Sequence, residues 1–412
     1  MVMKNRIFVF FILLVFSLAS IFSDEKKEFI LSEFIDIGLK NNPLIAAQQR
    51  EVEAKKAAYQ ASKRLFNPGF EYHRGKGEFF EKPETRDTEG FSIRQPLENP
   101  FKRHHRIQMF EKDWEAAEHV FAFLKLEVIY EIKNVFYKIL SLLEEEELAK
   151  KNVASIKEIH LLIDKRAKLG EVKELEAIKL HVEILKAQNE WNKIQTELKL
   201  AKEHLNKFLG NSLPEDFSVR GKLDYIPLEV NLTNILNKVL PSHPLIKEKE
   251  KDRDRAKSNL SYVKWQRFPD FTLSGFYHKE LDGKNKGIGI SFDIPLWNFK
   301  SKEIAEAENI YLKKQKELKA LKMKISTEVK SKFNQLRLSE QALKLFHEGL
   351  LKQAQESLKI SEVSYKQGEI SLIDYLDSQR TYFSILKDYQ DSLYDWNADK
   401  AALEKAIGEE LK

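Results

Sequence analysis

The sequence predicts a mainly α-helical protein with a small β contribution, in which one domain-sized unit occurs twice. Three observations predict this fold class. Short motifs of the first half recur in the second half at a nearly constant offset of about 200 residues. Each half has very long stretches without glycine or proline, which favour long helices. Each half also has a pair of short segments that alternate apolar and polar residues, which indicates a β-hairpin.

The first 23 residues are typical of a secretory signal peptide. Lys4 and Arg6 precede an unbroken apolar run at residues 7–16, and a charged stretch begins at Asp24. The apolar run is shorter than the ~20 residues that a membrane-spanning helix needs. We therefore expect residues 1–23 to be removed during export, with an uncleaved N-terminal anchor as the alternative.

Composition excludes several kinds of site and partner. The chain has no cysteine, which excludes disulfides, thiolate metal sites, a cysteine nucleophile and a lipid-bearing N-terminal cysteine. No stretch after residue 23 reaches the apolar length of a membrane helix, so any membrane contact must use strands or a surface. The formal net charge of +5 falls to +3 without Lys4 and Arg6, and charges of both signs are interspersed, so we expect no nucleic-acid partner.

An internal duplication organises the rest of the chain. Asn42-Pro43 recurs as His243-Pro244, each followed by Leu-Ile, at an offset of 201 residues. The other matching landmarks are Asn67-Pro68 with Phe268-Pro269, Gln95-Pro96-Leu97 with Ile294-Pro295-Leu296, Gly170-Glu171 with Gly368-Glu369, and Leu209-Gly210 with Ile407-Gly408. A unit of this size is far longer than the roughly 20 to 50 residues of a solenoid repeat, so two copies of a domain are expected.

These landmarks divide the processed chain into two repeats joined by a linker. We expect the first repeat at residues 24–210, the linker at 211–231 and the second repeat at 232–412. The linker is the long stretch between the halves without helical periodicity, and it carries two prolines and a glycine.

Each repeat opens with a helix and continues with a β-hairpin. The helical patterns cover residues 30–65 and 232–267, carry a proline early, and stop before a second proline. The alternating segments that follow have one apolar and one polar face, so we expect β-hairpins at about residues 69–97 and 270–296.

A pair of long helices completes each repeat, at about residues 100–210 and 298–408. No glycine or proline lies between Pro100 and Gly170, and a single glycine interrupts the corresponding stretch before Gly368. About 65 helical residues form a rod of about 100 Å, which a globular core cannot cover. Leucine and valine at seven-residue spacing in the second copy predict coiled-coil packing between neighbouring helices.

The two hairpins require more than one chain. They supply four strands, which are too few to close a barrel, and an open sheet edge is not tolerated facing lipid. Several chains must therefore share one barrel. Three chains would give twelve strands and a matching ring of helices.

The order and spacing of these motifs resemble the TolC family of outer-membrane efflux proteins over nearly all of the processed chain. The residues that carry the resemblance are Asn41-Asn42-Pro43-Leu44, Asn67-Pro68, Phe268-Pro269, Gln95-Pro96-Leu97, Ile294-Pro295-Leu296 and, above all, the stretch 365–380. The resemblance implies a homotrimer in the cell outer membrane, with a shared twelve-stranded transmembrane β-barrel and a periplasmic α-helical barrel. It also implies a passive exit duct that docks onto a periplasmic adaptor and an inner-membrane pump.

Two features near the first hairpin indicate a branch of that family. Gln95-Pro96-Leu97-Glu98 followed by the basic Lys102-Arg103 resembles the heavy-metal and cation efflux branch more than the drug branch. The transported substrate could be a metal cation, a drug or a protein, because a type I protein secretion duct has the same architecture.

An enzyme, a cofactor and a resident metal are not expected. The chain has no nucleophile elbow, phosphate-binding glycine loop, zinc-helix motif or dinucleotide fingerprint. The histidines, including His104-His105, show no metal-ligand spacing with carboxylates. A periplasmic coiled-coil scaffold or tether without a pore is the alternative from another class; it explains the heptads but not the duplicated hairpins.

Asp374 and Asp377 are the candidates for a pore constriction. They lie three residues apart near a helix N-terminus, so both carboxylates share one face. The resemblance implies that three chains present them as rings of negative charge that favour cations. The alternative is helix capping, because Ser371 and Asp374 have nearly the spacing of a capping box.

The resemblance also implies a gate latch, in which the Tyr365 hydroxyl donates to a carboxylate at Glu176. The chain departs from the best-known pattern, because the partner is Glu rather than Asp and Ile370 stands where some members carry a basic residue. Ordinary coiled-coil packing of Tyr365 is the alternative.

The two glycine turns are the expected contact points for the helical hairpin of the adaptor. They comprise Leu169-Gly170-Glu171 and Gln367-Gly368-Glu369. Capping of the preceding helix by glycine is the simpler role, and both roles can hold.

Overall fold

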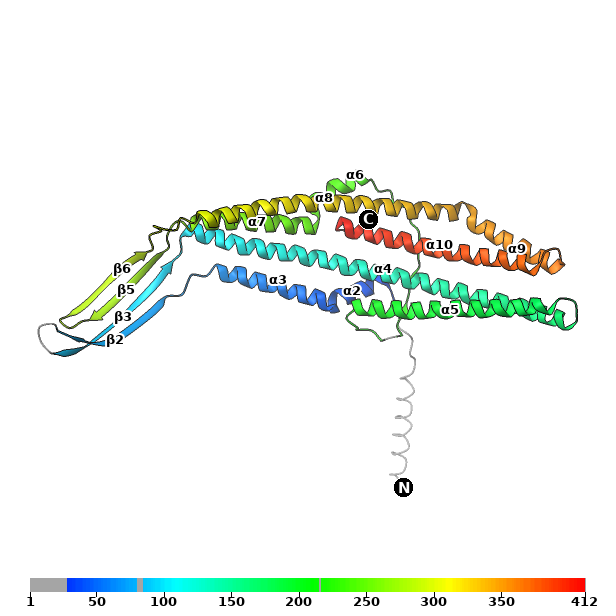
Figure 1. Cartoon of the computed structure of the whole chain (residues 1–412), viewed down its shortest axis with the longest axis horizontal. Helices are drawn as coiled ribbons and strands as arrows, with labels where there is room; N and C mark the ends of the chain where they lie inside the picture. The colour runs from blue at the N-terminus through cyan, green and yellow to red at the C-terminus, as the bar shows by residue number, and fades with distance from the viewer. Residues whose placement is uncertain (1–27, 80–83, 215, 412) are drawn as a thin grey trace, which may run out of the picture. The chain divides into compact units, whose positions relative to one another are not determined.

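A computed structural model describes residues 28–79, 84–214 and 216–411 (Figure 1). The expected signal peptide lies outside the described residues. The described chain separates into two compact units. The first takes in the described residues up to Asn42 with Val128–Pro227 and Leu336–Ala401, and the second takes in Pro43–Glu127, Leu228–Gln335 and the described residues from Ala402 onward. Each expected repeat contributes residues to both units, because its longest helix has residues in each.

The first unit consists mainly of long helices. Its elements are β1 (Glu28–Phe29), α2 (Leu31–Asn41), the later part of α4 (Pro100–Lys168), α5 (Glu174–Phe208), β4 (Ser218–Val219), the end of α8 (Ser301–Leu345), η1 (Phe346–Leu350), α9 (Leu351–Gln367) and most of α10 (Leu372–Ile407). α5 runs back beside α4, and α10 runs back beside α9 (Figure 1). Apolar side chains such as Ile139, Ile163 and Leu180 are fully buried along these helices.

The second unit combines helices with a four-stranded sheet. Its elements are α3 (Pro43–Ser62), β2 (Gly69–Glu78), β3 (Thr85–Leu97), the start of α4, α6 (Leu232–Ser242), α7 (Pro244–Trp265), β5 (Phe271–Lys279), β6 (Lys284–Phe292), the start of α8 and the end of α10. The sheet is antiparallel throughout, in the order β2-β3-β5-β6. In Figure 1 its strands lie side by side.

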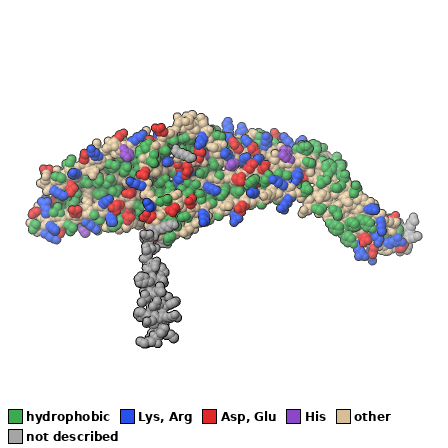
Figure 2. Space-filling view, turned by 180° about the vertical axis from the view of Figure 1, so that it is seen from behind, with side chains coloured by type: hydrophobic (Ala, Val, Ile, Leu, Met, Phe, Trp, Pro, Cys, Tyr) green, Lys and Arg blue, Asp and Glu red, His purple; other side chains and the backbone are tan. Residues whose placement is uncertain are grey.

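The sheet has one apolar and one polar face, as its alternating sequence predicts. Phe91 stands opposite Tyr72 on one side and Tyr277 on the other, and the Phe91 and Tyr277 rings stack with centroids 5.3 Å apart. The other exposed apolar side chains of the same face include Phe70, Ile93, Leu97, Phe271, Leu273, Ile288, Ile290 and Phe292. Figure 2 shows apolar side chains gathered over the strands. The described part of the chain leaves this face exposed.

Prolines and glycines set the ends of the helices. The expected opening helix of each repeat is two helices, α2 with α3 and α6 with α7, because Pro43 and Pro244 disfavour helical backbone at the preceding residue. Gly349 has a φ of 126° and interrupts the long helical stretch of the second repeat. Among the described residues, no helix has both the length and the apolar character needed to cross a membrane.

Candidate functional site

The two glycine turns of the first unit have the same backbone geometry. Gly170 and Gly368 adopt φ angles of 77° and 80°. The N–H groups of Glu171 and Glu369 each donate to the carbonyl five residues earlier, at 3.0 and 2.9 Å. This is the Schellman arrangement, which satisfies the last carbonyls of a helix and requires a left-handed residue. Both glycines therefore cap the C-terminus of the preceding helix.

All six residues of the two turns are exposed, but their side chains differ in their contacts. Glu171 accepts from Arg166 Nε at 3.1 Å, and Glu369 accepts from Ser364 Oγ at 2.8 Å, so each carboxylate is tied to the helix before it. Leu169 is 75% exposed. An exposed apolar side chain at a turn is compatible with docking, which remains a prediction.

Asp374 caps α10 while its neighbour Asp377 points to solvent. Asp374 Oδ2 accepts from Ser371 N at 3.1 Å and from Ser371 Oγ at 2.7 Å, and Asp374 N donates to Ser371 Oγ at 3.3 Å. The capping alternative is thus present in the structure. Both carboxylates are exposed, whereas the intervening Tyr375 and Leu376 are buried. The acidic pair therefore faces away from the packed side of α10, and its role in a pore ring remains a prediction.

Tyr365 packs in an aromatic pair beside its expected latch partner. Its ring stacks on Tyr375 of α10, with centroids 5.4 Å apart and an interplanar angle of 19°. Burial raises the pKa of Tyr365, and the nearby charge of Glu176 raises it further. Within the part of the chain that the structure describes, no hydrogen bond joins Tyr365 to Glu176. The two residues are neighbours, and the latch bond itself remains a prediction.

An apolar cluster holds these two helix pairs together inside the first unit. Its buried members are Ile156, Ile163, Ala177, Leu180, Leu372, Tyr375 and Leu376. Tyr365 and Ile370 pack against it, so the residue that replaces a basic latch group extends the apolar contact. Burial raises the pKa of Tyr375 to about 12.

Polar contacts that the sequence did not indicate connect α10 to the first helix pair. Gln379 Nε2 donates to Ser155 Oγ at 3.1 Å, and Arg380 pairs with Glu183 at 2.8 Å. Burial raises the pKa of Glu183, but hydrogen bonds from Lys186 and Arg380 bring it below its usual value. The only signal in the sequence is the position of Gln379 and Arg380 in the stretch that resembles the family signature.

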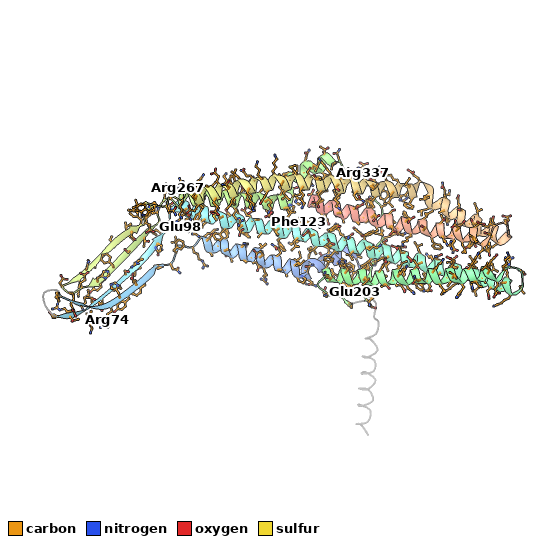
Figure 3. All side chains as sticks on the ribbon, in the orientation of Figure 1. Arg74, Glu98, Phe123, Glu203, Arg267 and Arg337 are labelled. Carbon is orange, nitrogen blue, oxygen red and sulfur yellow. The ribbon has the colours of Figure 1, made fainter. Side chains whose placement is uncertain are left out.

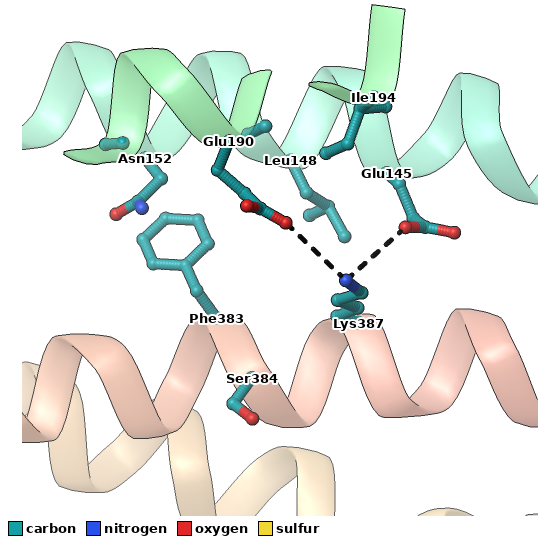
Figure 4. A pocket seen from close by; sticks show the side chains of 10 residues that line it. Glu145, Leu148, Asn152, Glu190, Ile194, Phe383, Ser384 and Lys387 are labelled. Carbon is teal, nitrogen blue, oxygen red and sulfur yellow. Dashed lines mark ion pairs between the residues drawn. The ribbon is translucent and has the colours of Figure 1, made fainter. Parts of the chain in front are cut away.

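A cavity of about 270 Å³ lies between α4, α5 and α10 in the first unit. Lys387 lies between Glu145 and Glu190, 3.9 Å from a carboxylate oxygen of each (Figure 4). Glu145 also accepts from Ser141 Oγ at 3.1 Å, so it is held in place by its own helix. Lys387 therefore links α10 to both α4 and α5.

The residues that indicated a metal-efflux branch form the junction of sheet and helices in the second unit. Glu98 accepts from Arg106 in a bidentate pair at 2.7 and 2.9 Å, and this contact raises the pKa of Arg106. Lys102 pairs with Asp270 just before β5. Figure 3 shows Glu98 and Arg267 where the strands meet the helices, and Arg74 farther along the sheet. Their evident role is to fix the sheet on the helices.

A known family pattern matches most of the chain, over residues 35–211 and 235–409, and describes outer membrane efflux proteins. The chain belongs to the outer membrane efflux protein family. It is 22% identical over 290 residues to the cobalt-zinc-cadmium resistance protein CzcC of Cupriavidus metallidurans, a match that covers 70% of this chain and 69% of that protein.

Solved structures of outer-membrane channels share the fold. The channel OprN superposes with a TM-score of 0.79 at 15% identity, over 92% of this chain and 89% of that one. The Campylobacter jejuni channel CmeC gives a TM-score of 0.78 at 16% identity, over 92% and 85% of the two chains. These matches confirm the predicted fold class.

Family membership confirms the predicted localisation and general function. The protein is an outer-membrane efflux channel with a periplasmic helical domain. Channels of this family are homotrimers that work in tripartite systems with an adaptor and a pump, and they are not enzymes. A periplasmic scaffold without a pore does not fit this family.

Proposed function

We propose that this efflux channel is the exit duct for divalent metal cations delivered by an inner-membrane pump through a periplasmic adaptor. The proposal is supported by the similarity to a cobalt-zinc-cadmium resistance protein over 70% of the chain. The single structural observation that carries it is the exposed acidic pair Asp374 and Asp377, which faces away from the packed side of α10.

Three copies of the acidic pair would form rings of negative charge in a trimer. Such rings favour cations over anions at close quarters. Tyr365 at the end of α9 and Glu176 in the first turn of α5 are neighbours in space, and they would form the latch that keeps the constriction shut until the adaptor docks. The adaptor would meet the two glycine turns, where Leu169 is exposed and both carboxylates are held by the preceding helix.

The same proposal includes the organisation of the chain. Residues 1–23 would be the export signal, and residues 24–210 and 232–412 would be duplicated repeats. The equivalence of two junctions supports the duplication. In the first, Asn42 Nδ2 donates to Phe208 O at 2.9 Å, just before the left-handed Gly210. In the second, His243 lies against the left-handed Gly408.

A deletion experiment tests the cargo. Cells that keep the pump and adaptor but lack this gene should become sensitive to Zn²⁺, Co²⁺ and Cd²⁺, and the intact gene should restore tolerance. Tolerance to a panel of organic drugs serves as the control and should not change. A strain that loses drug tolerance but keeps metal tolerance would contradict the metal cargo without contradicting the channel itself.

A further inference from the structure

Two histidines from strands that are not neighbours meet on the polar face of the sheet. His73 in β2 and His278 in β5 both stand opposite Gly90 of the intervening strand β3. Their backbones are two strand spacings apart, roughly 9.5 Å. The side chains nevertheless reach each other: His73 Nε2 lies 3.0 Å from His278 Nδ1, and the rings stack with centroids 4.9 Å apart.

Gly90 makes this meeting possible. A Cβ atom at this position would collide with both His278 Nδ1 and His73 Nε2. Any other residue would therefore require the rings to move from these positions. A glycine in the middle of a strand weakens the strand, and such a glycine often marks a close approach of other groups. Here the groups that approach over it are two imidazoles.

The two facing nitrogens of the pair are joined by a hydrogen bond, in which one ring donates and the other accepts. The donor ring must carry its proton on its other nitrogen before both facing nitrogens can bind a metal ion. On the same face, Glu71 is already paired with Arg94. The ring of Phe276 packs beside His278 at 5.4 Å and supports it from the side. Asn285 of β6 stands opposite His278 in the register of the sheet. His73 itself is exposed, so an ion can reach the pair from solvent.

We propose that His73 and His278 form a transit site for divalent transition-metal cations. Imidazole nitrogens are preferred ligands of Zn²⁺, Cu²⁺ and Ni²⁺. Two nitrogens 3.0 Å apart, each about 2.0–2.1 Å from a metal, subtend about 91–97° at that metal. This angle matches neighbouring positions of the tetragonal geometry of Cu²⁺ or Ni²⁺, and a small rotation that separates the nitrogens to about 3.3 Å gives the tetrahedral angle of Zn²⁺.

The location of the histidine pair is suited to transient binding of an ion during transport. In a closed barrel the apolar face meets lipid and the polar face lines the interior, so three such pairs would line the exit. Among the described residues, no group of three or more His, Asp or Glu is arranged to hold a metal ion. A pair leaves the other coordination positions to water, and conduction requires binding that is weak enough to release the ion. The inference rests on the proposed metal cargo, although the pair itself can be tested without transport.

Cu²⁺ titration of the purified full-length trimer in detergent, followed by electron paramagnetic resonance, tests the site. We expect one Cu²⁺ for each chain, with hyperfine structure from two nitrogens. His278→Gln and His73→Gln should each weaken binding by roughly tenfold or more. His104→Gln is the matched control, because it removes one histidine of the adjacent pair on α4 and should leave the affinity unchanged.

Gly90→Ala provides a second variant that keeps both histidines. The added methyl group should separate the rings, remove the two-nitrogen signal and weaken binding to the level of His278→Gln. The proposal is overturned if the intact trimer shows no two-nitrogen signal, or if His278→Gln binds Cu²⁺ as tightly as the intact protein. These results do not depend on metal tolerance in cells, so failure of the transit site and failure of the proposed cargo can be told apart.

Discussion

At the scale of single residues, Asp374 and Asp377 are the test of cation preference. Asp374→Asn with Asp377→Asn keeps the size of the side chains and removes their charge, and the new amide oxygen at the first position can still accept from Ser371. We expect the preference for K⁺ over Cl⁻ in single-channel recordings to fall several-fold, because the negative rings would be lost. Glu197→Gln with Glu203→Gln on α5 removes the same number of charges and should leave selectivity unchanged. An unaltered ratio in the Asp variant would refute the ring.

Tyr365 can be tested separately from its packing. Tyr365→Phe removes the hydroxyl but keeps the ring that stacks on Tyr375 at 5.4 Å. If the hydroxyl holds Glu176, the variant should open more often in the same recordings while its thermal stability stays within about 1 kcal/mol of the intact protein. Tyr375→Phe is the matched control. Equal open probabilities in all three proteins would leave Tyr365 as a packing residue only.

His243 links pH to stability through burial. Its side chain is 2% exposed, and its Nδ1 accepts from the N–H of Leu245 at 3.2 Å, so the folded protein holds a neutral ring. Burial lowers its pKa to about 4. The unfolded chain binds a proton near pH 6.5, whereas the folded chain does so near pH 4. Stability that is present above pH 6.5 is therefore lost as the pH falls towards 4, by about 3 kcal/mol for each chain.

His243→Asn should remove this pH dependence. Asparagine stands at the equivalent position of the first repeat, Asn42, and it is a good helix N-cap. Circular dichroism melts of the detergent-solubilised protein at pH 7 and pH 5 should show a smaller fall in Tm for the variant. His104→Gln, which replaces an exposed histidine of α4, should melt like the intact protein at both pH values. An equal fall in the His243 variant would show that other groups carry the effect.

Part of the candidate site could be predicted from local sequence. The capping box of Ser371 and Asp374 and the left-handed Gly170 and Gly368 depend on neighbours in the chain, and the sequence indicates both. The stacking of Tyr365 on Tyr375 depends on the orientation of α10 relative to α9 after Gly368. The spacing of residues in the sequence does not determine this orientation. The meeting of His73 and His278 needs the register of three strands, so no local pattern could indicate it.

At the scale of elements, the two faces of the sheet predict opposite responses to charge. Ile290 is 71% exposed on the apolar face, and Ser291 follows it on the polar face of β6. Ile290→Lys should lower the amount of folded trimer in outer membranes, because a lysine facing lipid costs about 2–4 kcal/mol near the bilayer midplane. Ser291→Lys adds the same charge one residue away and should assemble normally. The amount of SDS-resistant trimer on gels is measured for both variants. Equal losses of trimer would mean that lipid does not contact the apolar face selectively.

The elements also show where sequence patterns stop being sufficient. Long stretches without glycine or proline correctly predicted α4 and α5, since propensity and heptad spacing agree along them. The sequence predicts the position of the break at Gly349 but not its backbone conformation, because glycine is also tolerated inside helices at a cost of about 1 kcal/mol. Its φ of 126° is a conformation that glycine adopts readily and other residues rarely do, and composition alone does not reveal it.

At the scale of the whole molecule, the open sheet means that one chain is not a complete channel. Its four strands have two free edges, and in lipid each unpaired backbone group costs several kcal/mol. Three chains supply twelve strands, in agreement with the homotrimers of this family. The acidic pair, the histidine pair and the latch would each occur three times around the same axis, so each single substitution changes a ring of three groups.

The lack of cysteine allows the docking of the adaptor to be mapped without background. Leu169→Cys and Gln367→Cys each place one thiol on a glycine turn, and Ile226→Cys places one at a comparably exposed linker position. In cells that express the pump and an adaptor with a single cysteine at the tip of its helical hairpin, we expect disulfide cross-links from both turn positions and none from Ile226→Cys. Trimer yield should be unchanged in all three variants, because the turns lie outside the core of the unit. Cross-links of equal yield from Ile226→Cys would mean that the adaptor does not recognise the turns. That result would contradict a docking role for the turns at Gly170 and Gly368 but not their role as helix caps.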